Sequence, residues 1–137
     1  LCRRFHEEPM NLGVQFSSSR DIYHHFQTRL GNLKQERFII VILDNKHRFL
    51  SETTVTVGLL NRSLVHPREV FAEAIEQRAA AIICIHNHPS GDSSPSEEDK
   101  RITRRLQESG ELLGIPLLDH VIISKEDFTS FADEGWL

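Results

Sequence analysis

Cysteine, tryptophan, tyrosine and methionine are all scarce in this chain of 137 residues, which contains two, one, one and one of them. The two cysteines, Cys2 and Cys84, lie far apart in the sequence and neither belongs to a CxxC pair. This argues against a thiolate metal site and against a disulfide. So few cysteines fit a reducing compartment, and we expect a cytoplasmic protein.

Long apolar runs are also missing. The longest, FIIVIL at Phe38–Leu43, is far shorter than the roughly 18–20 residues that cross a bilayer, so no membrane association is expected. Residues Leu1–Asn11 are charged and lack the apolar core of a signal peptide. Because the chain begins with Leu1 and not with Met, we expect a fragment or a processed product.

A positive excess of charge is absent as well, since the formal net charge is −4 with eight histidines uncounted. Broad binding of nucleic-acid phosphates needs a basic surface, so the overall charge does not support it. Lys100–Arg105 (KRITRR) nevertheless forms a local basic patch. The length and the hydrophobic content of 39% fit one compact domain.

Apolar periodicity divides the chain into alternating helices and strands. We interpret residues 1–16 as a linker or N-terminal extension and residues 17–137 as the domain. The helix that begins at Pro67 should bury a stripe made of Val70, Phe71, Ala74 and Ile75. Helices mixed with strands indicate an α/β or α+β fold with a mixed sheet. The expected helices are Ser17–Leu33, a helix opened by Pro67, and Pro95–Leu113; the expected strands are Glu36–Leu43, Phe49–Val57, Ala79–Ile85, Pro116–Ser124 and Phe128–Phe131, with a loop at His86–Ser94.

His86 and His88 lie just after the third predicted strand. Alternate residues of an extended chain point the same way, so both imidazoles can converge on one ion while Asn87 points away. Neutral imidazole is a common zinc ligand. The alternative is a polar loop with two solvated histidines.

Asp99 follows early in the next helix. At about 100° per residue it lies near the direction of Ile102, Leu106 and Leu113, which we take as the buried stripe. A buried carboxylate needs a partner, and a cation held by His86 and His88 would supply one. Ser96 three residues before Asp99 also fits a capping box, and both roles can coexist. Three protein ligands with one open position are typical of catalytic zinc, with one Zn²⁺ expected per chain.

Such a site needs a general base, and several glutamates are candidates. Glu36 begins the first core strand on the face of Phe38 and Ile40, an unusual place for an acid unless it lines a site. A simple charge at the end of a strand is the alternative. The remaining candidates look solvated, suited to a helix start, or without special features: Glu52, Glu69, Glu73, Glu97 and Glu98.

The arrangement His86-x-His88, ten residues and Asp99, with Ser96 before it, resembles the signature of the JAMM (MPN+, JAB) metalloproteases. The segments VHPREVF, AAAIICIHNHPSG, PSEEDKRITRRLQESGELLGIPLLDHVII and FTSFADEGWL further resemble the bacterial RadC family, over roughly Ser17–Leu137.

The resemblance implies a cytidine-deaminase-like fold of the JAB/MPN type, with a curved mixed β-sheet between helices. It implies that His86, His88 and Asp99 are zinc ligands and that Glu36 activates water. Ser96 would help to stabilise the tetrahedral intermediate. The implied activity is a zinc-dependent metallohydrolase, a peptidase or isopeptidase-like amide hydrolase acting on a peptide or protein. Many isopeptidases of this kind have Ser or Thr where Asn87 stands, and 137 residues leave no obvious room for ubiquitin-gripping insertions, which argues against ubiquitin as substrate.

Two other functions stay open. One is a DNA-repair or recombination accessory module, the role for which RadC was named. The other is a non-catalytic interaction domain that keeps zinc for structure, although such sites are usually closed by four ligands. The string HNH at His86–His88 does not indicate an HNH nuclease, whose residues are spread over a ββα motif. Asp119 and His120, which we place at the beginning of a strand, are candidates to orient a ligand imidazole.

Overall fold

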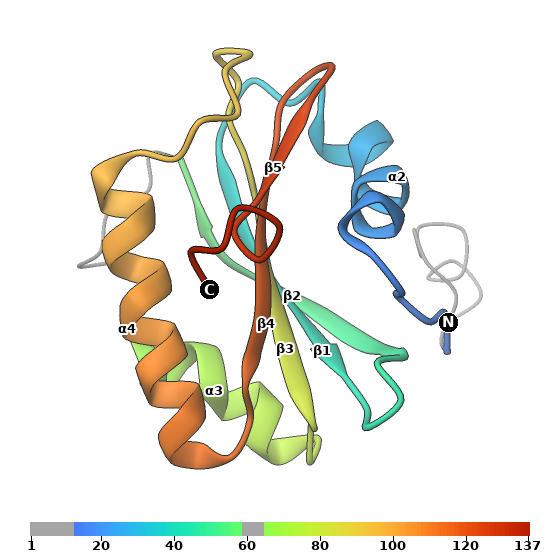
Figure 1. Ribbon diagram of the computed structural model, residues 1–137, viewed down its shortest axis with the longest axis vertical. Coiled ribbons are helices and arrows are strands. Elements are labelled where there is room, and N and C mark those ends of the chain that lie inside the picture. The colour runs from blue at the N-terminus through green and yellow to red at the C-terminus, as the bar shows by residue number, and fades with distance from the viewer. Residues whose placement is uncertain (1–12, 59–64) are drawn as a thin grey trace.

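A five-stranded mixed sheet forms the centre of the computed structural model, which describes residues 13–58 and 65–137 (Figure 1). The strand order is β2-β1-β3-β4-β5. Strand β1 is antiparallel to both of its neighbours, β2 and β3; β3 and β4 are parallel, and β5 is antiparallel to β4. This confirms the predicted α+β class with a mixed sheet. The strands are β1 (Arg37–Leu43), β2 (Phe49–Val57), β3 (Ala81–Asn87), β4 (Leu117–Ile123) and β5 (Phe128–Ser130).

Three described helices cover the two faces of the sheet: α2 (Ser19–Leu30), α3 (Pro67–Glu76) and α4 (Glu97–Leu113). Helix α2 lies on one side, and α3 and α4 lie on the other (Figure 1). The side chains of β1 and β3 therefore divide between two apolar cores. Burial on both faces explains why the central strands are continuous apolar runs and not alternating ones.

The parallel pair β3–β4 decides where a site can form. Parallel neighbours need a long crossover connection, and here α4 supplies it. The loop from β3 to α4 thus leaves the carboxyl end of a buried strand and enters the first turn of a helix. The two segments that carry the predicted metal ligands therefore meet at the carboxyl end of β3.

The third strand is longer at its end than predicted. We expected the loop to begin at His86, but β3 continues through Asn87. His86 pairs with Phe38 of β1, and Asn87 pairs with Ile123 of β4. Backbone pairing with both neighbours extends the strand, although the local composition there is polar.

Three further expectations about helices were wrong in detail. Helix α2 ends at Leu30, not Leu33, and a Cβ at Gly31 would lie 2.6 Å from the carbonyl oxygen of Gln27. Ile75 is 54% exposed and Leu113 is 47% exposed, so neither belongs to a buried stripe. Both lie at helix ends, beyond the part of the helix that packs on the sheet.

Residues 1–12, including Cys2 and most of the predicted linker, lie outside the described residues, so the domain boundaries stay predictions. Residues 13–16 run along the β1–β2 turn, where Phe49 exchanges backbone hydrogen bonds with Gly13 and Val14. Phe16 is buried in the core beside α2. No helix within the described ranges is long and apolar enough to cross a membrane.

Candidate metal centre

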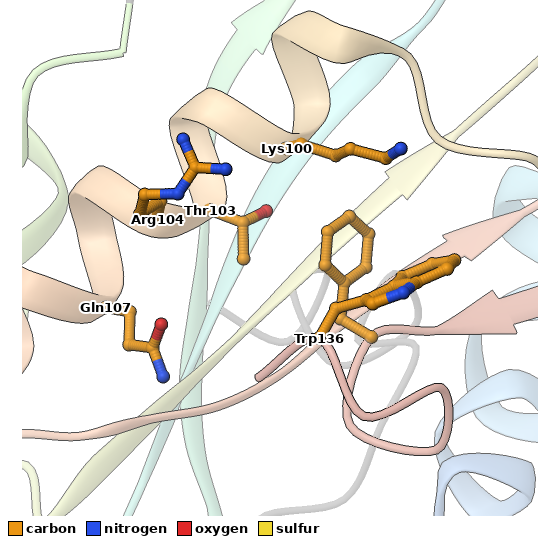
Figure 2. A pocket seen from close by; sticks show the side chains of 6 residues that line it. Lys100, Thr103, Arg104, Gln107 and Trp136 are labelled. Carbon is orange, nitrogen blue, oxygen red and sulfur yellow. The ribbon is translucent and has the colours of Figure 1, made fainter.

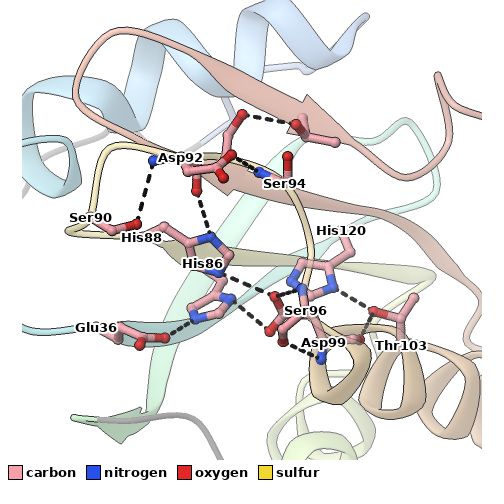
Figure 3. Close-up of polar contacts among 12 residues, drawn as sticks. Glu36, His86, His88, Ser90, Asp92, Ser94, Ser96, Asp99, Thr103 and His120 are labelled. Carbon is pink, nitrogen blue, oxygen red and sulfur yellow. Dashed lines mark hydrogen bonds and ion pairs between the residues drawn. The ribbon is translucent and has the colours of Figure 1, made fainter.

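His86 and His88 lie at the end of β3 on the face that points to α4 (Figure 3). His86 is 1% exposed, and the ring centroids of the two imidazoles are 4.7 Å apart. Asn87 faces the other way, as predicted, and contacts the backbone of Gln35 and Arg37 at the start of β1. The alternation of side chains along a strand therefore brings the two imidazoles together without a special turn.

Glu36 immediately precedes β1 and reaches the same place from 50 residues away. Its Oε1 lies 2.7 Å from Nε2 of His86. One ligand atom each from Glu36, His86 and His88 lies within 4.8 Å of the other two, so this group could hold a metal ion. The acid before the first strand therefore lies beside the two predicted imidazole ligands and not at an isolated strand end. The other glutamates proposed from sequence lie outside this group.

Asp99 lies in the first turn of α4 and is 1% exposed, as its inward position predicted. Its Oδ1 is 3.4 Å from Nδ1 of His86, and its Oδ2 is 3.1 Å from Nε2 of His88. Asp99 thus contacts both imidazoles, but it is not a member of the group that Glu36 forms with them. The structure brings all four residues together, and the assignment of His86, His88 and Asp99 as the ligands stays a prediction.

Ser96 caps α4, and the predicted capping box is present. Its hydroxyl accepts from the Asp99 backbone N–H at 3.0 Å, and Asp99 Oδ2 accepts from the Ser96 backbone N–H at 2.8 Å. The same Oδ2 also faces His88. The capping box is therefore confirmed, and the role of Asp99 as partner of a cation held by His86 and His88 stays a prediction.

The loop fixes the ring of His88. Its Nδ1 lies 2.9 Å from the carbonyl oxygen of Asp92, which can only accept, so Nδ1 carries a proton. Gly91 turns the chain back toward this contact with a φ of +94°, a conformation that favours glycine. A hydrogen bond to the outer nitrogen is the usual way to orient a metal-binding imidazole, and it leaves Nε2 of His88 directed at the site.

The electrostatics show how strongly the site attracts positive charge. Burial disfavours the charged form of His88, but its contacts with Asp99, Asp92 and Glu36 outweigh this and raise its pKa. Burial likewise works to raise the pKa of Asp99, but the hydrogen bond from His88, the charge of His86 and the Ser96 N–H lower it. These two shifts show that the surroundings of His88 and Asp99 favour a positive charge beside the Asp99 carboxylate.

The donor set fits a zinc ion. Two imidazoles and a carboxylate are the zinc ligands of many hydrolytic sites. Nδ1 of the buried His86 has no hydrogen-bond partner among the described residues, although it faces the carboxylate of Asp99. A buried imidazole nitrogen that faces a carboxylate needs a proton or a cation between or beside the two groups.

The pair Asp119–His120 separates into two roles. Asp119 accepts from the Ser130 hydroxyl at 2.6 Å and from the Ala132 backbone N–H at 3.0 Å, so it fastens the C-terminal turn and not a ligand. His120 is fully buried, and its ring centroid is 6.0 Å from that of His86. Thr103 contacts His120 and was not identified from sequence, although its place one turn after Asp99 is a signal.

The basic patch predicted at Lys100–Arg105 lies on α4, the helix that also carries Asp99 and Thr103. Lys100, Arg104 and Gln107 line a hollow of about 220 Å³ together with Trp136 (Figure 2). Lys100 lies 5.7 Å from the centre of the Trp136 ring and 3.5 Å from Glu97. Arg104 forms no ion pair within residues 13–58 and 65–137. The patch is therefore partly unneutralised although the chain is acidic overall.

The comparisons with known proteins agree with this fold. Residues 16–136 match the family model described as a RadC-like JAB domain, so the chain belongs to that family. A UPF0758 protein of Syntrophotalea carbinolica is 49% identical over all 137 residues, which span 60% of that relative. One of Bacillus licheniformis is 54% identical over 105 residues, 77% of this chain and 47% of the relative. One of Methanosarcina mazei is 46% identical over 140 aligned positions, which cover 60% of its length. The chain thus spans between about half and three-fifths of the length of these relatives.

Proposed function

We propose that this domain is a zinc-dependent hydrolase that cleaves an amide bond of a peptide or protein with activated water. The observation that carries the proposal is the convergence of Glu36, just before β1, on His86 and His88 at the end of β3. A structural zinc site needs no extra carboxylate of this kind, whereas a hydrolytic site needs a general base within hydrogen-bond reach. The identity of the metal and the activity both belong to the proposal.

In this proposal His86, His88 and Asp99 would hold the ion, and the ion would supply Lewis-acid chemistry that makes water easier to deprotonate. Glu36, with 21% of its side chain exposed, would take a proton from the attacking water and return it to the leaving amine. The Ser96 hydroxyl uses a lone pair to cap α4, so its proton is free to donate to the developing oxyanion. Asn87 and Asp92 act on the positions of Glu36 and His88.

A first experiment separates metal binding from chemistry. Purified protein is analysed for zinc and then profiled against peptide and isopeptide libraries. We expect close to one zinc per chain, loss of zinc in H88A, and retained zinc with hydrolysis reduced roughly 10²–10⁴-fold in E36Q. E69Q on the exposed side of α3 is the matched control and should behave as wild type. Full hydrolysis by E36Q would contradict the role given to Glu36.

The alternatives predict other results. A non-catalytic domain that keeps zinc for structure would bind zinc, and no substrate would be cleaved at a rate that depends on Glu36. A DNA-associated module would use the basic hollow on α4, which is the surface that favours this second function. The cytoplasmic location expected from the cysteine content stays a prediction.

A further inference from the structure

The imidazole ring of His120, which is not among the predicted metal ligands, is packed between aromatic side chains. Its ring stacks on Phe131, with centroids 4.7 Å apart and planes 12° apart, and it meets the edge of Phe38 at 5.6 Å. It lies on β4 opposite Cys84, on the sheet face that also carries His86. Its side chain cannot turn without disturbing both aromatic contacts.

The hydrogen bonds fix which nitrogen of His120 carries the proton. Thr103 Oγ1 lies 2.8 Å from the carbonyl oxygen of Asp99 and 2.5 Å from Nδ1 of His120. A carbonyl can only accept, so the single hydroxyl proton of Thr103 goes to it, and Nδ1 of His120 must donate to Thr103. Nε2 of His120 therefore presents a lone pair. It is fully buried and has no partner among the described residues.

His86 has the complementary requirement. Its Nε2 lies 2.7 Å from Glu36 Oε1, at the side where Glu36, His86 and His88 converge. When Nε2 of a neutral imidazole binds a metal, the proton resides on Nδ1 and needs an acceptor. Asp99 is engaged elsewhere if it is a ligand, because its Oδ2 already faces His88 and the Ser96 N–H, and its Oδ1 is 3.4 Å away.

We propose that His120 is a positioning residue whose Nε2 accepts the Nδ1–H of His86 in the metal-bound protein. In the structure the rings of His86 and His120 lie with their centroids 6.0 Å apart, and hydrogen bonds run from His120 through Thr103 to the Asp99 backbone (Figure 3). With the proposed bond added, this chain would join two predicted ligands through residues that touch no metal. The inference rests on the proposed zinc site but not on hydrolysis.

Two substitutions at one position separate orientation from packing. In H120N the amide replaces Nδ1, so it still donates to Thr103, but nothing replaces Nε2. In H120Q the longer side chain places its amide oxygen near Nε2, while the contact with Thr103 is lost. Zinc affinity is measured by competition with a chelator, and stability by urea unfolding of the metal-free proteins. These readouts are independent of any substrate.

We expect zinc affinity to fall about 10–100-fold in H120N and to stay near that of wild type in H120Q. If His120 only packs, the variant with the lower free energy of unfolding in its metal-free form should also have the lower zinc affinity. Wild-type affinity in H120N, or equal losses in both variants, would overturn the proposal. So would nitrogen NMR of the zinc-loaded protein that finds the His120 proton on Nε2. A domain that binds no zinc at all would instead overturn the proposed function.

Discussion

The side chain of Asn87 holds the backbone on both sides of Glu36. Its Oδ1 accepts from the Arg37 backbone N–H at 2.7 Å, and its Nδ2 donates to the Gln35 carbonyl at 3.0 Å. Asn87 is 1% exposed and lies between the two histidines, facing away from them. The residue that separates the predicted ligands thus positions the predicted base.

Replacing Asn87 with alanine should therefore affect Glu36 more than the metal. The two backbone partners lose a buried hydrogen bond each, which costs about 1–3 kcal/mol of stability. A displacement of about 1 Å at a reacting group can reduce a rate by as much as about 10²-fold. We expect N87A to keep its zinc and to hydrolyse slowly, as measured by metal content and by turnover well below its unfolding temperature. N87D, which keeps the acceptor for Arg37, should lie between N87A and wild type. Loss of zinc in N87A would contradict this separation.

Ser96 has a structural role and a proposed chemical role, and two variants distinguish them. S96A removes the N-cap acceptor of α4 and should cost about 1 kcal/mol. S96N restores an equally good cap but not the hydroxyl. If the hydroxyl donates to the oxyanion, both variants lose turnover while only S96A loses stability. Normal turnover in S96N would show that Ser96 caps α4 and that its hydroxyl does not take part in the reaction.

The metal-free protein should be most stable near pH 6.5. Burial lowers the pKa of His120 to about 3, so between pH 6.5 and 3 the unfolded chain binds a proton that the folded protein excludes, and stability falls as the pH falls. The pKa of His88 is raised, so its contribution is complete below 6.5 and is lost as the pH rises through its folded value. The lowered pKa of Asp99 adds a loss below about 3.8.

Urea unfolding across this pH range measures the effect, with a slope of at most about 1.4 kcal/mol per pH unit for one group. In H120Q the free energy of unfolding should depend less on pH between pH 4 and 6.5, and its dependence above pH 6.5 should stay unchanged. An acid slope that persists in H120Q would show that another group excludes the proton.

The basic hollow on α4 can be examined with the chain's single tryptophan. Trp136 lines the hollow and is 47% exposed, so its fluorescence should report on an occupant. If the hollow binds nucleic-acid phosphates, a single-stranded oligonucleotide should change the emission at low salt, with a slope of about −0.7 per phosphate contact on a logarithmic salt scale. R104Q should weaken this binding, and K125Q, at an exposed site outside the hollow, should not. An unchanged signal at low salt would dismiss the DNA-associated alternative for this surface.

Much of the fold could be read from the sequence because local patterns determine it. The run at Phe38–Leu43 is apolar at every position, and such a strand must be covered on both faces. Ser96 and Gly114 delimit α4 by a capping box and a left-handed C-cap, both of which have short sequence signatures. The end of β3 could not be read in this way, because backbone pairing with β1 and β4 extends it through polar residues.

The sequence by itself determined the parts of the site that depend on spacing along one element. His86 and His88 share a direction because a strand repeats every two residues, and Asp99 points inward because a helix repeats every 3.6. Only the tertiary structure decided what these side chains meet. Glu36 reaches His86 through the antiparallel register of β1 and β3, and His120 comes beside it through the parallel register of β3 and β4. Strand register is set by the packing of the whole sheet, so the distances that make these residues one site are properties of the assembled fold.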